Sequence, residues 1–431
     1  MPMYEEELAQ RGEKSQVGQT VTVPTEFEGE IAELYRPTMF QSNITILSCY
    51  IANFSDGFQN TLANPTNVIF KVLLGPHVYS SDMKTRTSNS LIIGAILGVV
   101  VLGYNSDMVS RRGGLLSTSS LVAIGIAGFG VGGEYPPSAA VGLEESDGIL
   151  RNYRGPLFVS FTTLMATLAG HILQIIYLIS LVASDNNLTV AFHTMYSIAT
   201  ILPVIIMVLR VFMVDSSLFH HSNLVNQRRS PRLFWLLARR IMSGVIISSL
   251  VENNDIRKTA VWQIVLAVLP VPAVMLGAWL TNSIGRRYTG ILGFVGYMIL
   301  GFIIGGTYTE LSRHIAAFVV LYELLQAFGH MGPGATIGLI SSEVFPTAMR
   351  GMGYGIATAF GRTGAAVGTE CFTHLQDQAG KSSTFYLAGG VAVLGIFVYY
   401  LLPESSEIDL EKEDRSLEDF LAEKGYKIGG K

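Results

Sequence analysis

Cysteine and charge are both scarce in this chain, and each scarcity excludes a class of protein. The two cysteines, Cys49 and Cys371, fall in apolar stretches, so the chain is not a disulfide scaffold. Only 14% of the residues are charged and 49% are hydrophobic, which excludes a disordered chain. The net charge is −4, and without a basic excess to neutralise phosphates a nucleic-acid partner is not expected.

The charge that is present gathers in the two tails. The first 38 residues hold eight Glu and three basic residues, and residues 403–431 hold nine acidic and five basic residues. No signal peptide is visible, because the first apolar segment begins only near Ile44. We expect both tails to be cytosolic and largely disordered, with one short amphipathic helix over 414–424.

Between the tails, seven windows contain no Asp, Glu, Lys or Arg at all. Each reaches the roughly 20 residues that one helix needs to cross a bilayer, whereas a buried helix of a soluble protein still shows a polar face. Three less clean spans are predicted over 43–73, 315–341 and 352–372, and a possible further span lies around 241–251. The sequence therefore predicts a polytopic α-helical membrane protein. The seven windows are 87–106, 113–133, 156–184, 186–209, 259–285, 288–309 and 382–403.

The chain divides into two related halves. The run DMVSRR at 107–112 recurs as NSIGRR at 282–287, and a basic cluster in mid-chain separates the two groups of spans. Basic loops mark the cytosolic side, and paired halves are typical of transporters built from repeats. We predict an N-terminal bundle over 39–214, a cytosolic basic linker over 215–240, and a C-terminal bundle over 241–402, flanked by acidic tails over 1–38 and 403–431.

The spacing between the Arg-containing turns differs between the two halves. Arg111 and Arg154 are 43 residues apart, but Arg286 and Arg350 are 64 apart, and the difference is about the length of one membrane helix. The run 113–142 crosses a core of about 30 Å once as a single helix, although both flanking Arg turns belong on the same side. One helix is therefore absent, or the run is re-entrant. The stretch 241–251 is likewise too short to span.

Several runs carry a resemblance to a known family. GYNSDMVSRR at 103–112 resembles the loop motif of the major facilitator superfamily. GIAGFGVGGEYP at 125–136, GHMGPGAT at 329–336, SEVFPTAMRG at 342–351 and GRTGAA at 361–366 are similar to motifs of its phosphate:proton symporter branch. Over about 39–431 the chain looks most like fungal glycerophosphodiester permeases of the glycerophosphoinositol type.

This resemblance implies a two-bundle fold of twelve helices, of which this chain keeps about 10–11 spans and lacks helix 3 and most of helix 7. It implies a proton-coupled importer of glycerophosphodiesters working by alternating access, with no catalytic activity, cofactor or metal. The implied partners are a small anionic phosphodiester, protons and the lipid bilayer, and the resemblance implies a place in the plasma membrane. Gly334 stands where phosphate transporters of the branch carry Asn, which favours a phosphodiester over free phosphate.

Asp56 and Glu134 are the candidates for proton coupling. An ionisable group inside a span is costly in hydrocarbon and usually faces a cavity or a partner. Burial favours the neutral form of a carboxyl, so such a group can load and release a proton. The alternative for Asp56 is a structural polar contact. The dinucleotide-like glycine pattern beside Glu134 is rejected, because no strand–turn–helix unit surrounds it.

Arg362 and Tyr135 are the candidates for substrate binding. A guanidinium group grips phosphate oxygens with two parallel hydrogen bonds, which an ammonium group cannot do. The alternative for Arg362 is a buried ion pair with Glu323 or Glu370.

Charged residues in the short loops are candidate gating elements. In the resembled family such residues form networks that hold one access state closed, although the arginines alone could serve as topology anchors. His171 and His330 are candidate proton relays, and ordinary packed histidines are an equal alternative. The gating candidates are Asp107, Arg111, Arg112, Arg154, Glu343 and Arg350.

Two alternatives to the glycerophosphodiester importer stay open. The first is a symporter of inorganic phosphate or another organic anion. The second, from a different class, is a transport-incompetent paralogue or membrane sensor, which the missing helices favour. An intramembrane enzyme is disfavoured, because the chain has no Gly-x-Ser-x-Gly or His-Glu-x-x-His motif.

Overall fold

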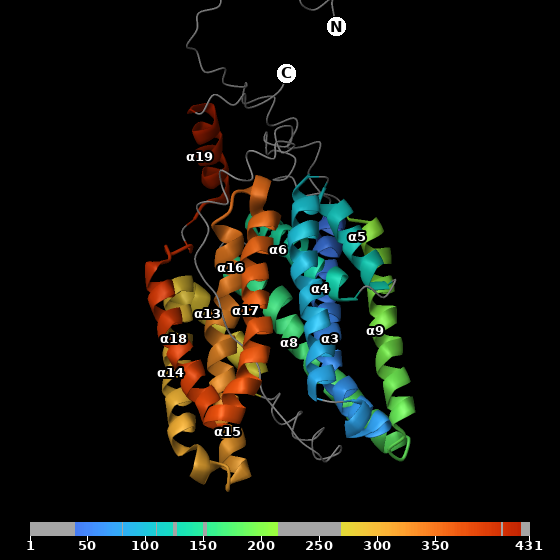
Figure 1. Ribbon diagram of the computed structural model, residues 1–431. Coiled ribbons are helices and arrows are strands. Elements are labelled where there is room, and N and C mark those ends of the chain that lie inside the picture. The colour runs from blue at the N-terminus through green and yellow to red at the C-terminus, as the bar shows by residue number, and fades with distance from the viewer. Residues whose placement is uncertain are drawn as a thin grey trace, which may run out of the picture. The chain divides into compact units, whose positions relative to one another are not determined.

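The computed structural model describes residues 39–79, 81–108, 110–123, 127–149, 153–213, 269–406 and 408–423, all of which belong to one compact unit, Pro37–Lys431. The ordered elements within these ranges are helices, with no strand among them (Figure 1), which confirms the predicted all-α class. The predicted tail 1–38, the linker 215–240 and the short span 241–251 lie outside the described residues.

The first half of the chain contributes helices that precede residue 213. The turn before α9 (Leu188–Val211) contains Asp185 and Asn186 at positive φ, a conformation that short polar residues tolerate. Asn187 then caps α9, because its side chain accepts hydrogen bonds from the backbone N–H groups of Thr189 and Val190. These helices are α3 (Met39–Val78), α4 (Ser81–Met108), α5 (Arg111–Ala123), α6 (Ala127–Ile149), the continuous stretch α7 (Arg154–Val159), η2 (Ser160–Leu164) and α8 (Met165–Ala183), and α9 (Leu188–Val211).

The second half contributes the helices after residue 268. The predicted amphipathic helix of the C-terminal tail is present as α19 (Leu410–Glu423). The remaining elements are α13 (Pro270–Ser283), α14 (Arg286–Leu311), the continuous stretch α15 (Ile315–Gly329), η4 (His330–Gly334) and α16 (Ala335–Glu343), the 3-10 turn η5 (Thr347–Met349), α17 (Arg350–Ala379) and α18 (Ser383–Leu401).

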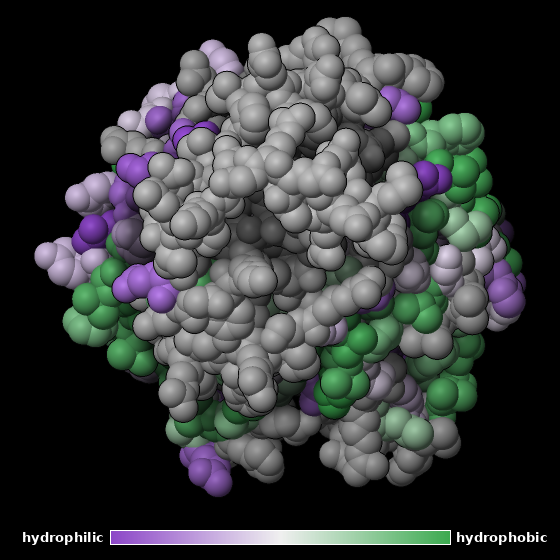
Figure 2. All heavy atoms as spheres, turned by 90° about the horizontal axis from the view of Figure 1, so that it is seen from above, coloured by the Kyte–Doolittle hydropathy of each residue, from purple (hydrophilic) through white to green (hydrophobic). Residues whose placement is uncertain are grey.

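Five stretches of the described residues are long and apolar enough to cross a membrane. Their outward side chains are hydrophobic: Leu394 is 64% exposed and Phe397 62% exposed, and hydrophobic residues gather on the flanks in the view of Figure 2. Large apolar side chains stay exposed in this way when lipid rather than water surrounds them. The five stretches are Asn89–Met108, Arg154–Ala183, Leu188–Val211, Arg286–Leu311 and Ser383–Leu401.

The run 113–142 is not one helix, which corrects the expectation of a single crossing there. It forms two helices, α5 and α6, that fold back on each other: Thr118 bonds Glu134, and Gly130 lies against Val122. The helix α5 has 13 residues, or about 20 Å, too short to cross a bilayer core of about 30 Å. Both alternatives agree with this hairpin, because no full-length helix directly precedes α6 and the chain folds back between α5 and α6. Inside the hairpin, the hydroxyl of Thr118 donates a hydrogen bond to the carboxylate of Glu134, and this bond links the two helices.

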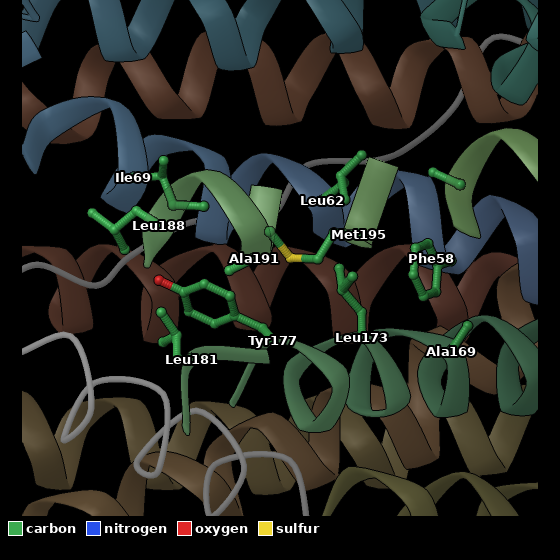
Figure 3. Packing of buried hydrophobic residues seen from close by; sticks show 11 residues of the cluster. Phe58, Leu62, Ile69, Ala169, Leu173, Tyr177, Leu181, Leu188, Ala191 and Met195 are labelled. Carbon is green, nitrogen blue, oxygen red and sulfur yellow. The ribbon is translucent and has the colours of Figure 1, made fainter. Parts of the chain in front are cut away.

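Apolar packing holds the first half together. Helices α3, α8 and α9 contribute one cluster, which contains Phe58 and Leu62 of α3 together with Leu173 and Tyr177 of α8 (Figure 3). Met195 of α9 closes the cluster and is fully buried. This packing fixes the position of α3, the helix that carries Asp56.

The contact between α4 and α6 is much closer, because glycines line it. A Cβ atom on Gly98 of α4 would lie 1.9 Å from the carbonyl oxygen of Phe129, and one on Gly132 of α6 would lie 2.1 Å from that of Ala95. Both obstacles are backbone atoms, which cannot move aside as a side chain can. Small residues at such positions are what lets two membrane helices approach.

We therefore expect Gly98→Ala to destabilise the protein by about 3 kcal/mol, the upper part of the range for overpacking. The thermal midpoint of the purified protein in detergent measures this. Gly390→Ala on α18 is the matched control, since a Cβ there meets nothing within 4 Å. Equal midpoints for the two variants would contradict the close α4–α6 contact.

The two halves meet along two seams. On one, α17 packs along α4, and on the other, α7 and η2 pack against α13. Two π-helical turns face each other where the halves meet, since Thr163 of η2 donates to the carbonyl of Gly334 of η4 at 2.9 Å. Wide turns of this kind are rare and are often found at functional sites.

Candidate functional site

Four charged side chains close the end of the molecule at which α4 ends and α17 begins. Arg111 pairs with Asp107, and its Nη2 lies 2.9 Å from Glu144 Oε1. Arg350 Nη1 reaches the same Glu144 oxygen at 2.9 Å. None of the four side chains is more than 5% exposed. We call these four residues the first latch cluster.

The first latch cluster joins the two halves of the chain. Asp107 of α4 accepts hydrogen bonds from the backbone N–H groups of Gly351, at 3.2 Å, and Met352, at 2.6 Å. Its carboxylate thus sits at the N-terminus of α17, where the helix dipole favours an anion. Arg111 also donates to the carbonyl of Thr347 at 2.8 Å.

A second latch cluster forms around Glu343. Arg154 of the first half donates through Nε to Glu343 Oε1 at 3.0 Å, and Arg286 of the second half reaches that oxygen at 3.2 Å. Ser405 donates to the other oxygen at 2.7 Å. Of the six gating candidates, Asp107, Arg111, Arg154, Glu343 and Arg350 therefore lie in the two clusters.

Arg112 is the sixth gating candidate, and it points elsewhere. Its Nη2 donates to the carbonyl of Val211 at the end of α9, at 2.5 Å. This contact stays within the first half of the chain. Arg112 thus ties α5 to α9.

The C-terminal tail packs onto both latch clusters. Glu404 accepts from the backbone N–H groups of Arg286 and Arg287 at the start of α14. Asp414 of α19 accepts from the N–H of Thr347 at 2.6 Å, and Leu417 and Leu421 pack with a hydrophobic cluster that includes Met349.

Burial raises the pKa of the Asp414 carboxyl above its ordinary value, against the lowering effect of its bond to Thr347 and of nearby Arg350. The docked tail therefore binds this proton more tightly than the undocked tail does. Docking is strongest at low pH and weakens as the pH rises through the raised pKa.

We expect Asp414→Asn to dock more tightly than wild type at pH 7 and to lose this pH dependence, because Asn stays neutral and keeps an accepting oxygen. Limited proteolysis of the tail between pH 5 and 8 measures docking. Asp419→Asn, at an exposed position of the same helix, is the control. Faster cleavage of Asp414→Asn would show that the charge itself stabilises docking.

Deeper in the first half, one face of α3 is polar where it meets α6. Asn53 donates to Ser138 at 3.0 Å, and Asn60 donates to the hydroxyl of Tyr135 at 3.1 Å. Asp56 lies between them on the same face, is 3% exposed, and has one oxygen, Oδ2, with no hydrogen-bond partner among the described residues.

The second half supplies a cation to this face. The guanidinium of Arg362 on α17 lies over the ring of Tyr135, 4.9 Å from its centroid. Among the described side chains Arg362 forms no ion pair with Glu323, and the side chain of Glu370 lies outside the described residues. The sequence-predicted residues Asp56, Tyr135 and Arg362 are therefore brought together.

Glu134 has a partner that the sequence did not reveal. It forms a buried ion pair with Arg210 of α9, which also donates to the carbonyl of Leu115 at 2.5 Å. Arg210 closely follows the charge-free window 186–209, so by sequence it was indistinguishable from an anchor at the end of a span. A small cavity of about 10 Å³, enough for about one water, touches both Glu134 and Asp56.

The remaining candidates lie apart from this face. His330 of η4 and His171 of α8 are close enough for their charges to interact. Glu323 is buried on α15. The described residues contain no group of three His, Cys, Asp or Glu side chains that could hold a metal ion.

Known proteins resemble this chain along most of its length. MFS-type transporter lnaF of Aspergillus flavus is 64% identical, over 91% of this chain and 89% of that protein. Glycerophosphoinositol permease 1 of Candida albicans and glycerophosphoinositol transporter 1 of Saccharomyces cerevisiae are each 30% identical, over 89% and 91% of this chain and 83% and 85% of theirs.

The alignment also indicates missing residues. It runs over 440 positions with the Aspergillus flavus protein, while 91% of this chain's 431 residues is about 392, so about 48 positions of the relative face a gap here. That is the length of about two membrane helices. The short α5 stands at the predicted position of one loss, and the predicted position of the other lies outside the described residues.

A family and a solved structure agree with these relatives. Residues 241–417 match the family described as sugar (and other) transporters. Among solved structures, this chain is similar to the proton:xylose symporter XylE bound to 6-bromo-6-deoxy-D-glucose. The TM-score is 0.70 at 17% sequence identity, and the match covers 88% of this chain and all of that one. Helices that cross a membrane, the superposition and the long alignments lead to one conclusion: this chain is an integral membrane protein of the major facilitator superfamily, similar to the glycerophosphoinositol permeases of its phosphate:proton symporter branch.

Proposed function

We propose that the protein is a proton-coupled importer of glycerophosphodiesters, glycerophosphoinositol among them, that works by alternating access at the plasma membrane. The observation that carries this proposal is the pairing of Arg362 of the second half with Tyr135 of the first, beside Asp56. The Nε of Arg362 has no hydrogen-bond partner among the described residues, so it can donate to an anionic phosphate, and a buried carboxyl nearby can take up the accompanying proton.

The latch clusters support the access cycle. Asp107, Arg111 and Glu144 of the first half hold Arg350 and the start of α17, while Arg154 holds Glu343. With both tails cytosolic, these contacts close the cytosolic side. Opening inward requires breaking both clusters, and the charges re-pair when the site turns outward again.

The relatives support the substrate class. Two of them are named for glycerophosphoinositol, and they align with nearly the whole of this chain. A phosphodiester carries one negative charge, which the single half-buried guanidinium of Arg362 matches. Inorganic phosphate or another organic anion is the runner-up, and uptake distinguishes the two.

Uptake of radiolabelled glycerophosphoinositol in yeast lacking its own permeases tests the proposal. We expect accumulation that rises as external pH falls and that excess unlabelled glycerophosphodiester suppresses more strongly than phosphate does. Surface expression without uptake of any anion in the panel would favour the transport-incompetent alternative, which the 13-residue α5 motivates.

A further inference from the structure

Asp56 and Glu134 touch the same cavity, but their surroundings differ. The cavity is lined by Ser55 and Asp56 of α3, Ser119 of α5 and Glu134 of α6, with Pro203 and Ile206 of α9. Asp56 keeps one oxygen without a hydrogen bond among the described residues. Glu134 has no such oxygen, because Thr118 and Arg210 satisfy its carboxylate.

Arg210 holds Glu134 with both terminal nitrogens. Its Nη1 lies 2.9 Å from Glu134 Oε2, and its Nη2 pairs with Oε1. The arginine is fully buried, and its Nη1 also donates to the carbonyl of Leu115 and the hydroxyl of Ser119. A two-point pair of this kind is among the strongest that side chains form.

The pair decides which carboxyl can change charge. Protonating Glu134 would leave the Arg210 charge buried without its counter-ion, a state that is strongly unfavourable. Protonating Asp56 breaks no ion pair and gives its open oxygen a hydrogen to donate. The two carboxyls are therefore not equivalent as proton carriers.

We propose that Arg210 is a positioning residue for proton coupling: it keeps Glu134 ionised, so that Asp56 alone takes up and releases the proton. This inference rests on the proposed symport and divides the roles within it. One proton passes from water to Asp56 Oδ2 and later returns to water, while Glu134 and Arg210 keep their charges and no other bond changes.

The groups around Asp56 set its proton exchange. The charges that act on it come from Arg210 of α9 and Arg362 of α17. Arriving substrate would neutralise Arg362 and so make protonation of Asp56 easier, which links anion and proton binding. Other titratable side chains on the elements packed against α3 include Glu134 and Tyr135 of α6, His171 and Tyr177 of α8, and His193 and Tyr196 of α9. Glu144 and Glu145 lie farther along α6, and Tyr104 and Asp107 lie on α4.

The test compares the pH profile of uptake between variants of the full chain in yeast. Arg210→Gln frees Glu134 to compete for the proton, so we expect at least tenfold lower proton-driven accumulation and a second step in the pH profile. Adding Glu134→Gln removes the freed carboxylate, and we expect the single-step profile to return with at least threefold recovery. Arg210→Lys should retain the single step. Arg313→Gln, which breaks the exposed pair with Glu310, is the control.

Two results would overturn the proposal. One is an unchanged pH profile in Arg210→Gln together with no recovery in the double variant, which marks Arg210 as structural only. The other is pH-driven accumulation that survives in Asp56→Asn. The thermal midpoint of purified Asp56→Asn in detergent shows whether the variant is folded.

A readout that needs no transport separates this proposal from the proposed function. Infrared spectra of the purified protein report neutral carboxyl groups. We expect Asp56→Asn to remove a pH-dependent neutral-carboxyl band that Glu134→Gln leaves in place. If no phosphodiester is transported, this pattern still supports the division of roles, and loss of the band in Glu134→Gln alone refutes it.

Discussion

Replacing Arg362 by Ala is expected to reduce glycerophosphodiester uptake by about 10- to 100-fold. Hydrogen bonds to a charged group contribute about 1.5–3 kcal/mol, and each 1.4 kcal/mol is tenfold in affinity. Arg362 comes from the second half, lies over Tyr135 at the Asp56 face, and forms no ion pair with the described side chains. Its loss removes the charge that the substrate anion needs.

Arg362→Lys is the matched variant, because it keeps the charge and loses the planar fork. We expect an intermediate reduction, seen mainly as a raised KM for uptake. Arg313→Ala, at an exposed ion pair, should leave uptake unchanged. Wild-type KM in Arg362→Ala would show that the anion binds elsewhere.

Replacing Glu144 by Ala is expected to destabilise the protein by about 3–5 kcal/mol. The carboxylate is fully buried and accepts from both Arg111 and Arg350. Removing it leaves two buried cations next to each other, and the cost of breaking a buried ion pair from one side lies in that range.

The thermal midpoint of the purified protein and the labelling of single cysteines placed at the latch end measure this effect. We expect a lower midpoint and faster labelling. Glu144→Gln, which keeps an accepting oxygen, should fall in between, and Glu310→Ala of the exposed pair should match wild type. Slow labelling in Glu144→Ala would show that Asp107 and Arg154 hold the end closed without it.

The sequence predicted the helices well where charge-free windows coincide with whole crossings. Windows 87–106, 156–184, 186–209, 288–309 and 382–403 each fall largely within such a helix or continuous helical stretch. Over 113–142 it left an absent helix and a re-entrant run as alternatives, because an apolar run has the same composition whether it crosses once or turns back. The contacts of Thr118 with Glu134 and of Val122 with Gly130 reveal the turn.

Only part of the candidate site could be predicted from the sequence. Asp56, Tyr135 and Arg362 stood out because each is polar within an apolar span, and the structure brings them together. Arg210 did not, since a cation at the end of a span usually faces the membrane surface. Glu144 was not among the sequence candidates, because a carboxylate near the end of a span gives no sign of its partners. Partners depend on packing, and sequence spacing does not encode packing.

The two π-helical turns, η2 and η4, change the face of the helix on which the side chains beyond them lie. A single π turn amounts to one extra residue in an otherwise regular helix, and one residue corresponds to about 100° of rotation. Residues before and after η2 or η4 therefore cannot be assigned to a common face by a 3.6-residue period. Deleting one residue from either turn would rotate everything beyond it by that angle and carry Thr163 and Gly334 out of register. Comparisons of lining residues between relatives must therefore align these turns first.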